Sequence, residues 1–175
     1  NFQNYENHKW FVFADYETTN GKPWAAPNDQ SRHLPGMEKK LQAGGVFKIV
    51  SYGDSITAGG EASKVELRFP QRYASYLQTR YSKSKIEFQD VSIPGKTSQQ
   101  GVEEFDKQME TVTSPDLVLV GFGMNDHNNM WGVEPEAFKD NLIQIVEKIK
   151  KQGAEAILFS SMPPNAKWCY SSHRM

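Results

Sequence analysis

The amino-acid sequence predicts an α/β domain built on a mainly parallel sheet, with helices on both faces. Short apolar runs, each closed by glycine or proline, alternate along residues 41–175 with longer stretches that have apolar side chains at helical spacing. This alternation is typical of βαβ units, whose parallel strands are buried from both sides. The expected strands are 46–52, 86–93, 117–122 and 156–160.

The first part of the pattern contains two strands and one helix. Residues 46–52 form an apolar run that ends at Gly53, as a buried parallel strand does. Residues 67–81 have apolar and aromatic side chains at helical spacing, which predicts a helix. Residues 86–93 form a second apolar run that stops at a Pro-Gly pair, so we expect the second strand there.

The second part contains two helices and two strands. Ser98 can cap a helix whose apolar face continues until a Ser-Pro break. Residues 117–122 are nearly all apolar and predict the third strand. Pro135 suits the first turn of a long helix that Gly153 can end. Residues 156–160 predict the fourth strand, which a pair of prolines follows.

Residues 1–40 differ from the rest in composition. They are rich in aromatic residues, asparagine and proline, and they have no helical period. The prolines, of which Pro35 is the last, argue against a long helix. We interpret 1–40 as a lead-in, the end of a preceding β-rich module, and 41–175 as the α/β domain. The aromatic side chains can stack on sugars or pack against the next domain, and we favour packing.

The composition restricts the kinds of partner. The 175 residues have a formal net charge of -1 and no long run of one sign, which disfavours a nucleic-acid partner. No run approaches the roughly 18 apolar residues of a membrane helix. The start of the sequence has no signal-peptide pattern, but a removed signal leaves no trace, so a bacterial cytoplasmic or secreted location stays open, as does the oligomeric state. One cysteine, Cys169, excludes an internal disulfide framework and a cysteine-rich zinc site.

The first polar loop, residues 53–57 with the sequence Gly-Asp-Ser-Ile-Thr, comes directly after the first expected strand. A serine hydroxyl is a weak nucleophile and must be presented without neighbouring bulk, which a strand-to-helix turn can do. We expect Gly53 to let the backbone bend sharply and the amide of Ser55 to donate to a developing oxyanion. Taken alone, the loop fits equally well a turn with a capping serine or threonine.

Two further loops follow the second and third strands. Gly95 comes after the second, and residues 121–126, Gly-Phe-Gly-Met-Asn-Asp, come after the third. The backbone N–H of Gly95 and the side-chain amide of Asn125 can both donate, while Gly123 keeps its loop tight. Each loop alone also fits a simple turn. Because the carboxyl ends of parallel strands meet at one edge, we expect these donors to converge with Ser55 on one oxyanion.

Together, the segments at 53–57, Gly95 and 123–126 resemble the first three conserved blocks of the SGNH (GDSL-like) hydrolase family. The resemblance covers about residues 41–170 and implies a flavodoxin-like three-layer α/β/α fold. It implies that Ser55 is the nucleophile and that Gly95 and Asn125 complete the oxyanion hole. Supporting roles then fall to Gly53, Asp54, Gly123 and Asp126.

The family resemblance also implies an activity. It points to a serine esterase or acylhydrolase that forms an acyl-enzyme on small-molecule or carbohydrate esters and needs no cofactor. The similarity is to bacterial members that have an N-terminal β-module. A non-catalytic carbohydrate-binding module or a degenerate hydrolase is the alternative. The sequence fits neither a phosphate-binding loop nor a dinucleotide-binding turn, and it has no metal-ligand motif.

One block of the family pattern has no counterpart in the sequence. The family's base is a histidine, usually with an aspartate three residues before it, after a fifth strand. His127 lies at the right sheet edge, but Met124 stands three residues before it, so we treat it as the less favoured base. His173 has Tyr170 at that place. We therefore expect the domain to be truncated after its fourth strand, with the Asp/His block beyond Met175 and with little activity in this piece alone.

Overall fold

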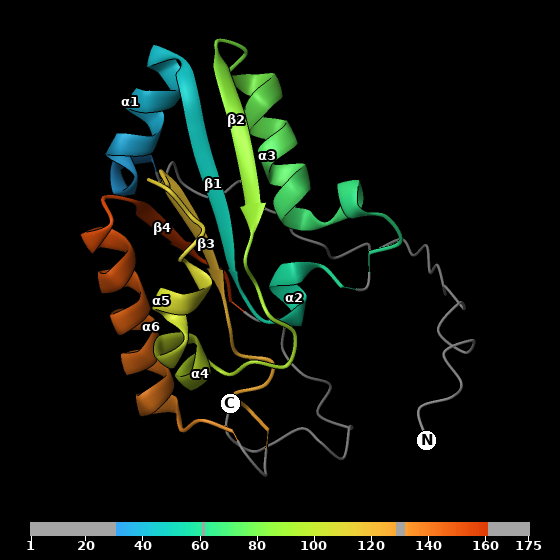
Figure 1. Cartoon of the computed structure of the whole chain (residues 1–175), viewed down its shortest axis with the longest axis vertical. Coiled ribbons are helices and arrows are strands. Elements are labelled where there is room, and N and C mark those ends of the chain that lie inside the picture. The colour runs from blue at the N-terminus through green and yellow to red at the C-terminus, as the bar shows by residue number, and fades with distance from the viewer. Residues whose placement is uncertain (1–30, 61, 129–131, 161–175) are drawn as a thin grey trace, which may run out of the picture.

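The computed structural model describes residues 31–60, 62–128 and 132–160. These residues fold into three layers, a sheet between two layers of helices (Figure 1). Within these residues, four parallel strands make one sheet in the order β2-β1-β3-β4. The strands are β1 (Gly45–Gly53), β2 (Ser84–Asp90), β3 (Leu117–Gly121) and β4 (Glu155–Leu158). The helices are α1 (Pro35–Ala43), α2 (Ser55–Ala58), α3 (Phe69–Arg80), α4 (Ser98–Glu103), α5 (Phe105–Gln108) and α6 (Pro135–Lys151), with 3-10 turns η2 (Ser31–His33) and η3 (Val65–Leu67). The predicted α/β/α fold with a parallel sheet is confirmed.

The core has one layer on each face of the sheet. In β1, Phe47 and Ile49 pack with residues of α1 and α3, while Val50 and Tyr52 pack with residues of α5 and α6. β3 alternates in the same way, and all five of its residues are buried. A strand covered on both faces is apolar at every position rather than at every second one. This explains why the strands appear in the sequence as short continuous apolar runs.

The start of α4 differs from the prediction. Thr97, and not Ser98, is the N-cap: its hydroxyl accepts from the amide of Gln100, whose side chain accepts in return from the amide of Thr97. Ser98 is fully buried and points its hydroxyl elsewhere. The single long helix expected here is also divided at Glu104 into α4 and α5. Both residues are good caps, so the local pattern could not choose between them.

The prolines of residues 1–40 argue against a long helix, and the structure has a short one there: α1, of nine residues, begins within that segment. Pro35 is the first residue of α1, where the missing N–H of proline costs nothing because that N–H has no partner within the helix. Leu41 anchors the helix in the core at 1% exposure. The division expected at residue 40 therefore passes through α1. Residues 1–30, on which the proposed N-terminal module depends, lie outside the described residues.

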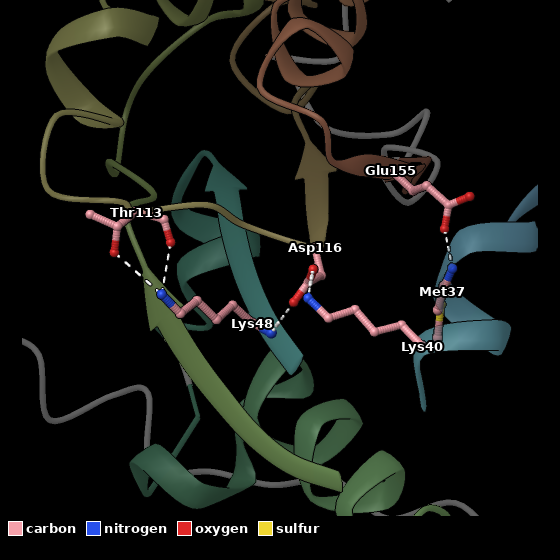
Figure 2. Close-up of polar contacts among 6 residues, drawn as sticks. All are labelled: Met37, Lys40, Lys48, Thr113, Asp116 and Glu155. Atoms are coloured by element: carbon pink, nitrogen blue, oxygen red, sulfur yellow. Dashed lines mark hydrogen bonds and ion pairs between the residues drawn. The ribbon is translucent and has the colours of Figure 1, made fainter. Parts of the chain in front are cut away.

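Two carboxylates fix α1 to the sheet at its amino-terminal edge (Figure 2). Glu155, the first residue of β4, accepts hydrogen bonds from the amides of Gly36 at 3.0 Å and Met37 at 2.5 Å. Asp116, which precedes β3, forms an ion pair with Lys40 of α1. α1 has no side-chain cap from its own sequence, so Glu155 supplies the acceptor for its first amides. α1 thus packs against the sheet and bonds to it.

Candidate active site

The three polar loops meet at the carboxyl edge of the sheet, the end toward which the strand arrows point (Figure 1). Gly53 and Gly121 are register partners at the ends of β1 and β3. The amide of Asp54 donates to the Gly121 carbonyl at 3.0 Å, and the amide of Ile93 donates to the Gly53 carbonyl at 2.8 Å. These two bonds join the loop after β1 to the loops that follow β3 and β2.

Gly53 is needed for space rather than for a special backbone angle. A Cβ atom at this position would lie 2.0 Å from the carbonyl oxygen of Gly121 and 2.3 Å from Oγ1 of Thr57. Thr57 fills the gap between the two strand ends, and its buried hydroxyl donates to the Gly121 carbonyl at 2.7 Å. Gly53 is not among the described glycines with positive φ. The predicted reason for this glycine, a sharp bend, is therefore replaced by close packing.

Ser55 is half-buried at the first position of the four-residue helix α2. Asp54 is its N-cap and accepts from the amide of Ile56 at 2.9 Å, and Gly59 ends the helix in the left-handed conformation. Burial raises the pKa of the Asp54 carboxyl, hydrogen bonds from backbone amides oppose the shift, and repulsion from Asp126 adds to it. Asp54 thus stabilises the turn by capping α2, while Ser55 is the first residue of that helix.

Gly95 and Asn125 lie next to each other. The side-chain amide of Asn125 donates to the carbonyl of Lys96, the residue after Gly95, at 2.9 Å. An amide nitrogen has two hydrogens, so it can hold this bond and donate a second one. Gly95 has a φ of 81°, which favours glycine, and a Cβ there would meet nothing within 4 Å. The two side-by-side loops bring together both groups that the sequence predicts as oxyanion donors.

Asp126 and His127 complete the loop after β3. Asp126 is buried and accepts from the amide of Ser98 at 2.8 Å. Burial raises the pKa of its carboxyl, and hydrogen bonds from Ser98 oppose the shift. His127 is half-buried, and its Nδ1 lies 3.3 Å from the carbonyl oxygen of Gly123, so the ring folds back onto its own loop. Gly123 takes a φ of 134°, which fits a tight glycine turn.

A small pocket borders the serine turn. It has a volume of about 150 Å³ and is largely apolar, with the edge-to-face ring pair Phe69 and Phe159 on one side. Ile56 and Thr57, which follow Ser55, line it as well. Within the described part of the chain, no group of three histidine, cysteine or acidic side chains is suited to hold a metal ion. In that same part, no helix is both long and apolar enough to cross a membrane.

Sequence comparison matches residues 51–174 to the GDSL-like lipase/acylhydrolase family. The chain belongs to this family. The match includes the serine turn, Gly95 and the Asn125 loop, so the predicted family is confirmed. His173 and the other residues after position 160 lie outside the described residues.

Two curated family relatives are hydrolases. The chain is 29% identical over 125 residues to an arylesterase of Vibrio mimicus, which covers 71% of this chain and 60% of that protein. It is also 29% identical over 135 residues to thioesterase 1/protease 1/lysophospholipase L1 of Escherichia coli strain K12, covering 75% and 61%. The chain therefore spans about three-fifths of the length of these relatives.

Two solved structures share the fold. A two-domain esterase active on acetylated mannans, co-crystallised with mannopentaose, has a TM-score of 0.63 and 25% identity, covering 73% of this chain and 34% of that one. TesA has a TM-score of 0.54 and 26% identity, covering 70% and 66%. Both similarities support the three-layer architecture and the family assignment.

Proposed function

We propose that the protein carrying this chain is a serine carboxylic ester hydrolase with Ser55 as its nucleophile. The observation that carries the proposal is that hydrogen bonds link the loops after β1, β2 and β3 at one edge of the sheet. Asp54 bonds to Gly121, and Asn125 bonds to the residue after Gly95. These bonds support a proposal in which the amides of Ser55 and Gly95 and the side chain of Asn125 serve one oxyanion, which is the arrangement that acyl transfer requires.

The proposed reaction is acyl transfer through an acyl-enzyme. Ser55 Oγ attacks the ester carbonyl, and its proton passes to a base that later returns it to the leaving alcohol. The negative charge on the carbonyl oxygen is held by the amides of Ser55 and Gly95 and by the side chain of Asn125. Water then attacks the acyl-serine and releases the acid. Removing one such donor typically costs about 10²–10³ in turnover.

The base is proposed to be a histidine outside the described residues. His127 is the only histidine of the three sheet-edge loops, but its ring bonds to the carbonyl of Gly123 within the same loop. In the family pattern the base carries an aspartate three residues before it, and Met124 occupies that place here. His127 is therefore assigned to loop structure rather than to proton transfer.

The proposed substrates are small-molecule or carbohydrate esters. The pocket beside the serine turn is largely apolar, which suits the acyl part of an ester. The similar two-domain esterase is active on acetylated mannans. Acetylated oligosaccharides are thus the first natural substrates to try.

The proposal is tested by assaying the full natural protein for hydrolysis of p-nitrophenyl acetate and p-nitrophenyl butyrate. We expect Ser55→Ala to abolish the burst of acyl-enzyme formation and to reduce kcat by about 10⁴-fold or more. We expect Asn125→Ala to reduce kcat by about 10²–10³-fold with little change in KM. Equal rates for wild type and Ser55→Ala would refute the esterase and favour the non-catalytic carbohydrate-binding module.

A further inference from the structure

Three buried polar side chains meet behind the proposed oxyanion donors. Ser98 is the first residue of α4, Asp126 lies in the loop after β3, and Asn141 lies in α6. Their exposed fractions are 0%, 3% and 4%. Buried polar groups are costly unless they are hydrogen-bonded, so a cluster of three from distant parts of the chain has a specific geometry to maintain.

The hydrogen bonds of this cluster form a chain in which Asn141 donates to Ser98 and Ser98 donates to Asp126. The Asn141 amide donates to Oγ of Ser98 at 3.0 Å. Ser98 then donates twice to Oδ1 of Asp126, from its hydroxyl at 2.5 Å and from its backbone amide at 2.8 Å. A hydroxyl can accept and donate at once, so Ser98 links an amide to a carboxylate. Bonds to a buried carboxylate are strong, and they hold α4 and the loop after β3 at a fixed separation.

The cluster lies directly next to the proposed oxyanion donors. Asn125 precedes Asp126 in the chain, and Gly95 stands three residues before Ser98. The two loops are joined a second time by the bond from Asn125 to the carbonyl of Lys96 at 2.9 Å. The capping box at the start of α4 fixes the backbone between these bonds. Two cross-links thus determine how far the Gly95 amide lies from the Asn125 side chain.

We propose that Ser98, Asp126 and Asn141 are positioning residues that set the separation of the oxyanion donors Gly95 and Asn125. This inference rests on the proposed function. The three side chains are buried and bonded to one another, so they act through the donors and not on the substrate. Displacing a catalytic group by about 1 Å can cost about 10²-fold in rate, so a small shift of either loop is enough to be measured.

The test is the kinetics of Ser98→Ala in the natural protein with p-nitrophenyl acetate. The variant loses the hydroxyl bonds but keeps the amide bond to Asp126, so the loops stay joined with a looser spacing. We expect kcat to fall about 10- to 100-fold and KM to change less than about threefold, because the donors act mainly on the transition state. Binding of a phosphonate that mimics the tetrahedral intermediate should weaken by a similar factor.

Two further variants separate positioning from folding. In Ser98→Ala with Asn141→Leu, the orphaned amide is removed as well, so stability should recover toward that of wild type while kcat stays low. Gln99→Ala is the matched control, because Gln99 is exposed on α4 and its side chain donates to Glu103 of the same helix at 2.8 Å. It should retain wild-type kcat. A Ser98→Ala kcat within twofold of wild type, or full recovery of kcat in the double variant, would overturn the proposal.

Amide hydrogen exchange decides the inference independently of activity. Segments 93–97 and 121–127 should exchange faster in Ser98→Ala than in wild type, while the strands keep their protection. If wild type hydrolyses no more ester than Ser55→Ala, the proposed function fails, and faster exchange in both segments would still support the positioning role. Unchanged exchange in both segments would overturn that role even in an active enzyme.

Discussion

Replacing Gly53 with alanine should strongly destabilise the protein and disturb the serine turn. The added Cβ would lie 2.0 Å from the carbonyl oxygen of Gly121, which belongs to the neighbouring strand end and cannot rotate away. It would also lie 2.3 Å from Oγ1 of Thr57. The two strand ends must therefore separate, and the bond between the Asp54 amide and the Gly121 carbonyl at 3.0 Å must lengthen or break.

The expected loss of unfolding free energy has two contributions, the steric overlap of the new Cβ and the lost hydrogen bond of the Asp54 amide. Forcing an extra carbon into a well-packed site costs about 1–3 kcal/mol, and leaving a buried amide without its acceptor costs about 1–3 kcal/mol. Together they give about 2–6 kcal/mol, out of the roughly 5–15 kcal/mol by which domains are folded. We expect the melting temperature to fall by about 2–4 °C for each kcal/mol in a chain of this size.

Urea denaturation of Gly53→Ala and Gly60→Ala measures this effect against a matched control. Gly60 follows α2, on the other side of the serine turn, and a Cβ there would come within 4 Å of the carbonyl oxygen of Ser55 alone, at 3.8 Å, an ordinary contact. Gly60→Ala should change stability by less than about 0.5 kcal/mol. If Gly53→Ala costs less than about 1 kcal/mol, or no more than Gly60→Ala, the close-packing explanation is wrong.

Substitutions at three other positions test separate parts of the structure. Glu155→Ala should lower stability by about 1–2 kcal/mol in urea denaturation, because the first amides of α1 lose their acceptor, whereas Glu155→Gln should lose less; equal losses would contradict the capping role. Because burial raises the pKa of Asp126, its contribution to stability is full below the unfolded pKa and is lost as pH rises through the folded pKa. Asp126→Asn should therefore gain stability relative to wild type as pH rises above about 4, the ordinary pKa of the carboxyl, and a difference independent of pH would refute this. His127→Gln should retain more than about a tenth of wild-type kcat, and a loss of about 10⁴-fold would identify His127 as the base.

Much of the fold was predictable because its signals are local. The third strand was expected at 117–122 and is found at Leu117–Gly121, since a strand buried on both faces is apolar throughout. The loop at 53–57 was correctly placed after a strand because glycine and polar residues end an apolar run abruptly. The helix α1 is not predictable in this way, because its strongest marker, Pro35, fits the end of a helix as well as the first turn of one.

The candidate site was predictable in its residue types but not in its contacts. The sequence indicated that Ser55, Gly95 and Asn125 follow strands and can serve one oxyanion. It did not indicate Ser98 as a partner of Asp126, because Ser98 fits a helix cap as well as its neighbour Thr97 does. That choice depends on a carboxylate 28 residues further along the chain.

The sequence by itself determined where the four strands follow one another along the chain and the chemical character of the sheet edge, because periodicity and turn residues act over a few neighbours. Only the tertiary structure decided which of these groups touch. The bond from Asn125 to Lys96 spans 29 residues, and the bond from Gly36 to Glu155 spans 119. Such contacts depend on how packed layers bring distant segments together, and no local pattern of residue types encodes that distance.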